Sequence, residues 1–286
     1  MPGIDLHTHS TASDGTFSPA EVVRMAFEAG LEAVALTDHD TTSGLPEAVK
    51  TGRELGIEVV PGCELSVTSE TGFMHIVGLF LPENPKGLIQ AMEYLRERRH
   101  SRNIRIVEKM RAVGLDVNYE EVVEFAKGES VGRPHLAGIL LKKGYVSSIQ
   151  EAFDEYLGEG GKVYLPKDKF TPEKGLPALK AEGATVILAH PYTLELEGQA
   201  LEAKVRELKD LGLDGMECHY SEHTPEMTSS YLALVRKLDL VVSGGSDFHG
   251  QAKPEISLGV GRGDLFIPYS VLQAIKDRRR AQGLGV

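Results

Sequence analysis

One order of segments recurs along the sequence: a short apolar segment ends in polar residues, and a helix follows. Residues 32–37 (EAVALT) run into Asp38, His39 and Asp40, and a helical segment over about 46–55 stops at Gly56. Further strands are predicted within residues 3–15 and at 57–64, 74–81, 184–189, 214–219 and 240–243, with helices at about 172–182, 199–211 and 225–237. Such alternation favours parallel strands joined by right-handed crossovers, either closed into a barrel or laid out as an open sheet. The pattern predicts an α/β protein with about seven strands.

The first predicted strand, in the segment GIDLHTHSTASDG, runs into His7, His9 and Asp14. Histidines at positions i and i+2 of a strand point to the same face, so both imidazoles can reach one metal ion. Taken alone, a pair of surface histidines beside a turn aspartate is an equally good interpretation. Ser18 and Glu21 then form a capping-box pattern, which predicts that a helix begins here and runs to about Gly30.

Between Pro85 and Pro166, the alternation of strands and helices gives way to helices alone. These are predicted at about 86–113, 119–126, 134–143 and 148–157. We predict a barrel domain of residues 1–85 and 162–286, with a helical insertion, or cap, at 86–161. Residues 94–111 carry seven Lys or Arg against two Glu. A solvated helix face is the favoured interpretation of this surplus, and an anion-attracting cap over a phosphate-containing substrate is the alternative.

Composition limits the class of protein further. The 286 residues are 41% hydrophobic, and 31 basic against 42 acidic residues give a net charge of −11, which disfavours a broad nucleic-acid-binding surface. Cys63 and Cys218 are the two cysteines, too few for a disulfide framework. No basic-then-apolar segment typical of a secretion signal opens the given sequence, and we expect no membrane span because no apolar run reaches about 20 residues. We expect a soluble cytoplasmic protein with no membrane contact.

Nine residues with nitrogen or oxygen donors fall at the ends of the predicted strands. In a parallel barrel these ends meet at one rim, so the side chains are expected to share one cleft. The absence of thiolates disfavours a closed structural zinc site, and the donors suit two or three divalent ions of the Mn, Zn or Fe type. The predicted metal ligands are His7, His9, Asp14, His39, Glu64, His75, His190, Asp247 and His249.

The motifs HTHSTASDG, TDHD, PGCE, MHIVG, AHP and SDFH, in this order across residues 7–249, resemble those of the PHP family, named for polymerase and histidinol phosphatase. The likeness is greatest to its small stand-alone phosphoesterases. It implies a distorted seven-stranded β/α barrel, a metal cluster that is usually trinuclear, and hydrolysis of phosphate esters. Many family members have histidine where this chain has Asp14, and a carboxylate is the harder donor.

Carried over by motif, the resemblance distributes the ligands over three ions. His7 and His9 would bind one ion together with Glu64 and Asp247. Glu64 would bridge to a second ion, held by His75 and His190. The third ion would be held by Asp14, His39 and His249.

A metal cluster of this kind implies a specific chemistry. A water molecule that bridges two divalent ions becomes acidic enough to supply a hydroxide nucleophile near neutral pH, without a serine or cysteine. Glu64 and Asp247 are therefore predicted to be catalytic as well as ligating. Asp38 and Asp40 either orient ligand imidazoles or serve as turn and cap residues.

Other residues are weaker candidates. Arg133 and His135 (GRPH) start a predicted helix, where phosphate binding is favourable, although an ordinary proline-started helix is the alternative. The resemblance extends to GRPH and favours substrate contact. Lys167 could also contact a phosphate, although a solvated side chain is the favoured interpretation. The remaining predictions are a substrate-facing or structural role for His219 and His223, and inert core positions for Cys63 and Cys218.

The predicted function is hydrolysis of a phosphate ester by a metal-dependent phosphoesterase. The group that the chain resembles includes enzymes acting on nucleoside 3′,5′-bisphosphates and on short RNA or DNA ends, so a nucleotide phosphate is the expected substrate. Histidinol phosphate is the alternative substrate. One rival function is a non-catalytic metal-binding module that docks on a polymerase. The other is an amidohydrolase with a similar barrel and metal site. No stable protein partner is implied.

Overall fold

The computed structural model describes residues 3–82, 84–126, 131–166 and 169–286. The chain divides into two compact units, residues 1–92 with 170–286 and residues 93–169. These limits lie within eight residues of the boundaries expected for the barrel and the insertion. The assignment of 86–161 as a separate cap subdomain stays a prediction.

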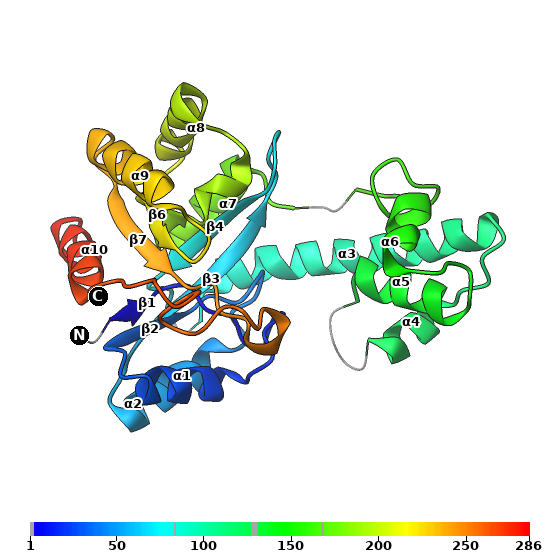
Figure 1. Cartoon of the computed structure of the whole chain (residues 1–286), viewed down its shortest axis with the longest axis horizontal. Coiled ribbons are helices and arrows are strands. Elements are labelled where there is room, and N and C mark those ends of the chain that lie inside the picture. Colours follow the sequence, from blue (N-terminus) through cyan, green and yellow to red (C-terminus); the bar gives the residue numbers. More distant parts are fainter. Residues whose placement is uncertain (1–2, 83, 127–130, 167–168) are drawn as a thin grey trace. The chain divides into compact units, whose positions relative to one another are not determined.

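The first unit is built on a seven-stranded sheet whose strands follow in chain order, β1 to β7 (Figure 1). Backbone bonds close it: Leu6 N donates to Gly244 O at 3.2 Å, and Asp247 N donates to His7 O at 2.9 Å. The prediction of a distorted seven-stranded barrel is confirmed. The strands are β1 (Ile4–Asp5), β2 (Ala33–Leu36), β3 (Glu58–Val67), β4 (Met74–Leu79), β5 (Thr185–Leu188), β6 (Gly215–Tyr220) and β7 (Val241–Gly245).

Strand β4 departs from the parallel pairing that the alternation predicted. It runs antiparallel to both β3 and β5, with Cys63 opposite Gly78 and Ile76 opposite Leu188. Only residues 68–73 separate β3 from β4, too few for the crossover that a parallel pair needs. As a result β4 begins, rather than ends, at the rim where its neighbours β3 and β5 end.

Helices follow most strands, and their ends obey the signals in the sequence. Ser18 and Glu21 form the expected capping box, and Gly56 ends the second helix in the left-handed region at φ 77°. The last helix of this unit was not among the predicted ones. The helices are α1 (Pro19–Glu28), α2 (Leu45–Leu55), α7 (Pro172–Ala181), α8 (Gly198–Asp210), α9 (Pro225–Lys237) and α10 (Tyr269–Ala281).

The second unit is helical, as predicted, and has its own apolar core. Helix α3 (Lys86–Ala112) starts in the first unit and continues into the second, followed by α4 (Tyr119–Phe125), α5 (Arg133–Lys142), α6 (Ile149–Ala152) and a π-helical turn (Phe153–Leu157). Two of the basic residues of 94–111 have internal roles, since Arg102 Nε donates to Leu165 O and Lys109 Nζ to Tyr164 O. The buried core includes Ile106, Met110, Val122, Leu136, Leu140 and Val163.

The segments that lead out of the barrel and back into it attach near opposite ends of β3. On the way out, Leu81 N donates to Pro61 O at 3.0 Å. On the way back, Phe170 O accepts from Thr68 N at 2.8 Å. Among the described residues, no helix combines the length and apolarity that crossing a membrane requires.

Candidate metal centre

Strand ends from across the sequence deliver their polar side chains to one place in the first unit. His7 and His9 follow β1, His39 follows β2, and His190 follows β5. The reversal of β4 explains why His75, at the beginning of its strand, joins the same group. Donor atoms lie within 4.8 Å of one another in four sets: His9, Asp14, His39 and His249; His7, Glu64 and His190; His7, His9 and Asp247; His39, Glu64 and His75. The structure therefore brings all nine predicted ligands together.

Glu64 lies at the centre of this cluster and is fully buried. Its Oε1 lies 3.0 Å from both His75 Nδ1 and His190 Nε2. Its Oε2 lies 3.0 to 3.2 Å from three more imidazole nitrogens, those of His7, His9 and His39. One carboxylate thus faces five imidazoles, which is the position expected of a bridging ligand.

Asp247 uses its two oxygens for different neighbours. Its Oδ1 lies 3.2 Å from His9 Nε2 and 3.7 Å from His7 Nε2, on the cluster side. Its Oδ2 accepts hydrogen bonds from Tyr220 OH at 2.8 Å and from Lys253 Nζ at 2.6 Å. These two donors bond the oxygen that faces away from the cluster, and so hold the carboxylate in place.

Asp14 forms the exposed edge of the cluster. Its Oδ1 lies 3.2 Å from His249 Nε2, and its Oδ2 lies 3.8 Å from His39 Nε2. The Asp14 side chain is 56% exposed, whereas Glu64 is inaccessible. A metal ion held at this edge would be the most accessible to solvent.

The buried carboxylates require compensating positive charge. Burial would raise the pKa of Glu64, but the imidazoles of His39, His7 and His75 outweigh it and hold that pKa well below its usual value. The pKa of Asp247 is likewise held low despite burial, by the nearby imidazoles of His9 and His7. Burial lowers the pKa of His9, and the nearby carboxylates of Asp247 and Glu64, each 3.2 Å from its Nε2, overcome this and raise it to about 9. Either protons or metal cations can supply the compensating charge.

The donor atoms themselves test whether metal ions fit. Among the described residues, the buried atoms that lack a hydrogen-bond partner include His7 Nε2, both ring nitrogens of His9, His39 Nδ1, His75 Nδ1 and Glu64 Oε2. Buried polar atoms are normally hydrogen-bonded, so this concentration of unpaired atoms demands an explanation. Divalent ions fit, because imidazole nitrogen and carboxylate oxygen are the donors that Zn, Mn and Fe accept.

Sequence analysis missed Glu217, which supports two predicted ligands. Its Oε1 lies 3.2 Å from His7 Nδ1, and its Oε2 accepts a bond from His190 N at 2.7 Å. A carboxylate that bonds the far nitrogen of an imidazole fixes the orientation of the ring and makes the near nitrogen a better ligand. The available signal was one acidic residue inside the buried strand GMECHY.

Two loops of the cluster are held in unusual backbone conformations. His190 has φ 24° and Asp247 has φ 60°, a region that non-glycine residues rarely occupy.

Asp38, predicted either to orient an imidazole or to serve in a turn, accepts hydrogen bonds from Ser10 and Ser13 and so stabilises the loop after β1. Asp40 Oδ1 accepts from Ser66 N at 2.9 Å.

The weaker candidates have varied surroundings. Arg133 and His135 lie in the second unit, where Arg133 NH1 donates to Leu157 O and His135 Nδ1 accepts from Gly132 N. Substrate contact by these two residues stays a prediction. Lys167 lies outside the described residues. His223 Nδ1 bonds Cys218 O at 3.1 Å. Both cysteines are buried, and burial raises the pKa of each thiol.

Comparison with known proteins agrees with this geometry. The PHP domain model matches residues 5–165. A 5′-3′ exoribonuclease of Haemophilus influenzae is 36% identical over 248 residues, covering 86% of this chain and 89% of the relative. A 3′,5′-nucleoside bisphosphate phosphatase of Chromobacterium violaceum is 29% identical, covering 87% and 88%.

A solved structure shares the whole architecture. It is the crystal structure of a protein from Bifidobacterium adolescentis assigned as a metal-dependent phosphoesterase. It is 28% identical, has a TM-score of 0.77, and covers 97% of this chain and 96% of its own. The chain belongs to the PHP-domain family, and it is a phosphoester hydrolase built on that fold.

Proposed function

We propose that the chain uses two or three divalent ions of the Mn, Zn or Fe type to hydrolyse a nucleotide phosphate. The substrate is a nucleoside 3′,5′-bisphosphate or a short RNA or DNA end. The observation that carries the proposal is the convergence of unpaired buried imidazole nitrogens on Glu64. The names of the two relatives, an exoribonuclease and a nucleoside bisphosphate phosphatase, support the substrate class. The two free cysteines favour a reducing, cytoplasmic location.

The distances support the distribution of ligands over three ions that the resemblance implies. His7, His9 and Asp247 would hold one ion, with Glu64 in reach of it. His75 and His190 would share Glu64 with a second ion. Asp14, His39 and His249 would hold the third.

When bound, the divalent ions would acidify a water molecule and offset the charge that develops on the phosphate oxygens. The protein contributes orientation: Glu217 holds the His7 ring, and Tyr220 and Lys253 hold the Asp247 carboxylate. The Lys253 side chain is 40% exposed, so its ammonium group adds positive charge at an accessible edge of the cluster. Arg133 and His135 are proposed to contact the substrate phosphate.

The test is a metal analysis of the purified protein followed by a product screen. The screen would use adenosine 3′,5′-bisphosphate, a 5′-phosphorylated RNA oligonucleotide, histidinol phosphate and an amide substrate. We expect phosphate from the bisphosphate or mononucleotides from the RNA. Preferential release of phosphate from histidinol phosphate would overturn the substrate assignment, and hydrolysis of the amide alone would indicate an amidohydrolase.

The matched variants are Glu64→Gln and Glu28→Gln, a buried and an exposed glutamate. Residues that only orient metal ligands are worth about 10- to 100-fold in affinity or activity, so loss of the central ligand should lower turnover at least about 100-fold. Glu28→Gln should have no effect. Full activity and full metal content in Glu64→Gln would show that Glu64 is not a metal ligand.

A further inference from the structure

A cavity lies in the barrel unit, at the end opposite the metal cluster. Its lining includes Glu58 and Val59 from the start of β3, Phe80 after β4, and Gly183 before β5. These positions are at the N-terminal ends of the parallel strands, whereas the predicted ligands gather at the C-terminal ends. The cavity measures about 740 Å³, within the range of about 300 to 1,000 Å³ typical of small-molecule sites.

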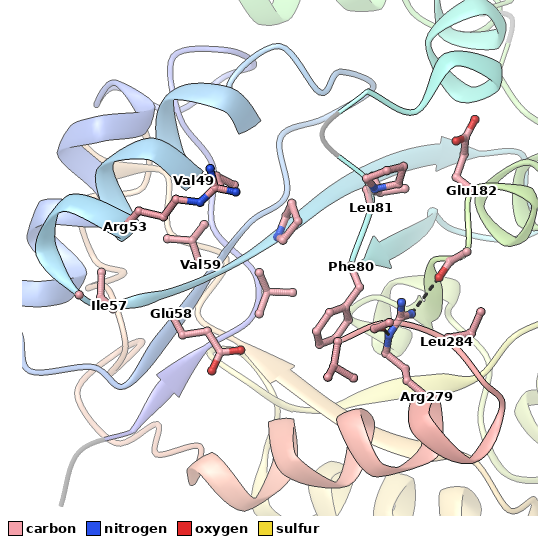
Figure 2. A pocket seen from close by; sticks show the side chains of 18 residues that line it. Val49, Arg53, Ile57, Glu58, Val59, Phe80, Leu81, Glu182, Arg279 and Leu284 are labelled. Carbon is pink, nitrogen blue, oxygen red and sulfur yellow. Dashed lines mark hydrogen bonds between the residues drawn. The ribbon is translucent and has the colours of Figure 1, made fainter.

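The walls of this cavity are largely apolar. Figure 2 shows Val59 and Ile57 on one side, with Phe80, Leu81 and Leu284 on the other. An apolar molecule, or the apolar part of one, would be removed from water on entering this space. Removing apolar surface from water favours binding in proportion to the area that is buried.

The charged residues of the lining are Arg53, Glu58, Glu182 and Arg279; Arg53 is exposed, and Arg279 is the buried cation. Arg279 is 4% exposed, and its guanidinium lies over the Phe80 ring at 4.4 Å (Figure 2). Its Nε donates to Gly285 O at 2.7 Å, and its NH1 donates to Gly183 O and to Thr185 Oγ1, both at 2.9 Å. All these acceptors are neutral. Within the described part of the chain, no carboxylate forms an ion pair with this buried cation, and its NH2 group has no hydrogen-bond acceptor.

The neighbouring carboxylates are engaged elsewhere. Glu58 is bound by Lys276 Nζ at 2.7 Å and by Tyr269 OH at 2.8 Å. Glu182 Oε1 accepts a bond from Leu88 N, in the first turn of α3, at 3.0 Å. Asp214, whose charge also acts on the Arg279 guanidinium, is bound by Lys180 Nζ at 2.8 Å. None of these described carboxylates forms an ion pair with Arg279, and the negative charge of Glu58 and Glu182 disfavours a ligand that carries more than one.

We propose that this cavity binds a small monocarboxylate with an apolar body. The carboxylate would pair with the free edge of the Arg279 guanidinium, since a buried charge is stabilised by an opposite charge that also hydrogen-bonds to it. The apolar body would lie against Val59, Ile57 and Phe80. This site is separate from the metal cluster, and its existence does not depend on the proposed hydrolysis.

The experiment is isothermal titration calorimetry of the full chain with octanoate and with octylamine, which at pH 7.5 carry opposite charges on the same chain. We expect saturable binding of octanoate near one per chain, and binding of octylamine at least about tenfold weaker. Equal affinity for the two probes, or no saturable binding of octanoate, would overturn the proposal. This comparison needs no variant and no activity measurement.

Two variants locate the site. Arg279→Gln should weaken the preference for octanoate over octylamine at least about tenfold, because it removes the buried cation of the lining. Val59→Phe, at a partly exposed position, should fill the cavity and weaken octanoate binding at least about tenfold. Val123→Phe, at a 46% exposed position in the second unit, is the matched control and should bind octanoate normally. Unchanged octanoate binding in Val59→Phe would also contradict the proposal.

Discussion

Glu217 shows how a residue without a place in the predicted ligand set can still control it. Its two carboxylate oxygens bond a ring nitrogen of His7 and the backbone N–H of His190. These two histidines approach different oxygens of Glu64, so one buried side chain supports both sides of the central ligand.

We predict that Glu217→Gln lowers metal affinity by about 10- to 100-fold, the usual effect of losing a partner that orients a ligand. The amide would keep only one of two acceptor oxygens, so one of the two bonds is lost. Competition with a chromogenic chelator would measure the affinity, and chemical unfolding would show whether the fold is retained. The control is Glu226→Gln, an exposed position in the first turn of α9. Wild-type affinity in Glu217→Gln would assign Glu217 a purely structural role.

The candidate metal ligands could be predicted from the sequence where they follow the end of a predicted strand. The cluster was indicated by the histidines at positions i and i+2 of the first strand, and by Asp247 and His249 after the last strand. Glu217 was not readable, because a single acidic residue in an apolar strand has no partner in sequence. Its partners His7 and His190 are 210 and 27 residues away and meet it only in the folded barrel.

At the level of elements, the closure of the barrel depends on a close approach between the end of β7 and the segment after β1. A Cβ added to Gly245 would lie 2.2 Å from His7 Cβ and 2.6 Å from His7 N. These are a Cβ and a backbone atom, which cannot rotate away. A side chain at position 245 would therefore push His7 out of the cluster.

We expect Gly245→Ala to destabilise the protein by about 1–3 kcal/mol, the typical cost of overpacking, and to reduce the amount of bound metal. Thermal unfolding and metal analysis would measure the two effects. In Gly285→Ala, an added Cβ meets nothing within 4 Å, so this control should be near neutral. If both variants retained wild-type stability and metal content, the contact with His7 would not constrain the cluster.

The elements were predicted well wherever local signals were strong. Ser18 with Glu21 and the glycine at 56 marked the ends of α1 and α2 correctly, because capping depends on neighbouring residues alone. The direction of β4 was not predicted, since an apolar run has the same pattern in either direction. The six residues between Val67 and Met74 were the available clue.

At the scale of the whole molecule, two separate cores imply two units that can respond differently to a mutation. The core of the second unit includes Leu136 and Leu140, both fully buried, and is built from residues 93–169. The metal cluster draws all its residues from the first unit. A cavity in the second core should therefore leave the cluster intact.

We predict that Leu140→Ala destabilises the second unit by about 2–5 kcal/mol, the usual cost of truncating a buried leucine. Metal content should stay at the wild-type value. Denaturant unfolding monitored by circular dichroism, together with metal analysis before unfolding, would measure both. Loss of bound metal in the folded variant would show that the two units are energetically coupled.

The attachment of the helical insertion to the barrel sets a requirement for any shortened form of the protein. The first unit ends before the insertion at Met92, whose Sδ lies 3.9 Å from Cys63 Sγ, and it resumes at Phe170, whose O accepts from Thr68 N. Cys63 and Thr68 are five residues apart in and just after β3, which at about 3.3 Å per residue is roughly 17 Å. A linker replacing the insertion must therefore span about this distance, and it needs at least about five extended residues. We expect a two-residue turn to be too short, to distort the attachment of β4 and to displace His75 from the other ligands.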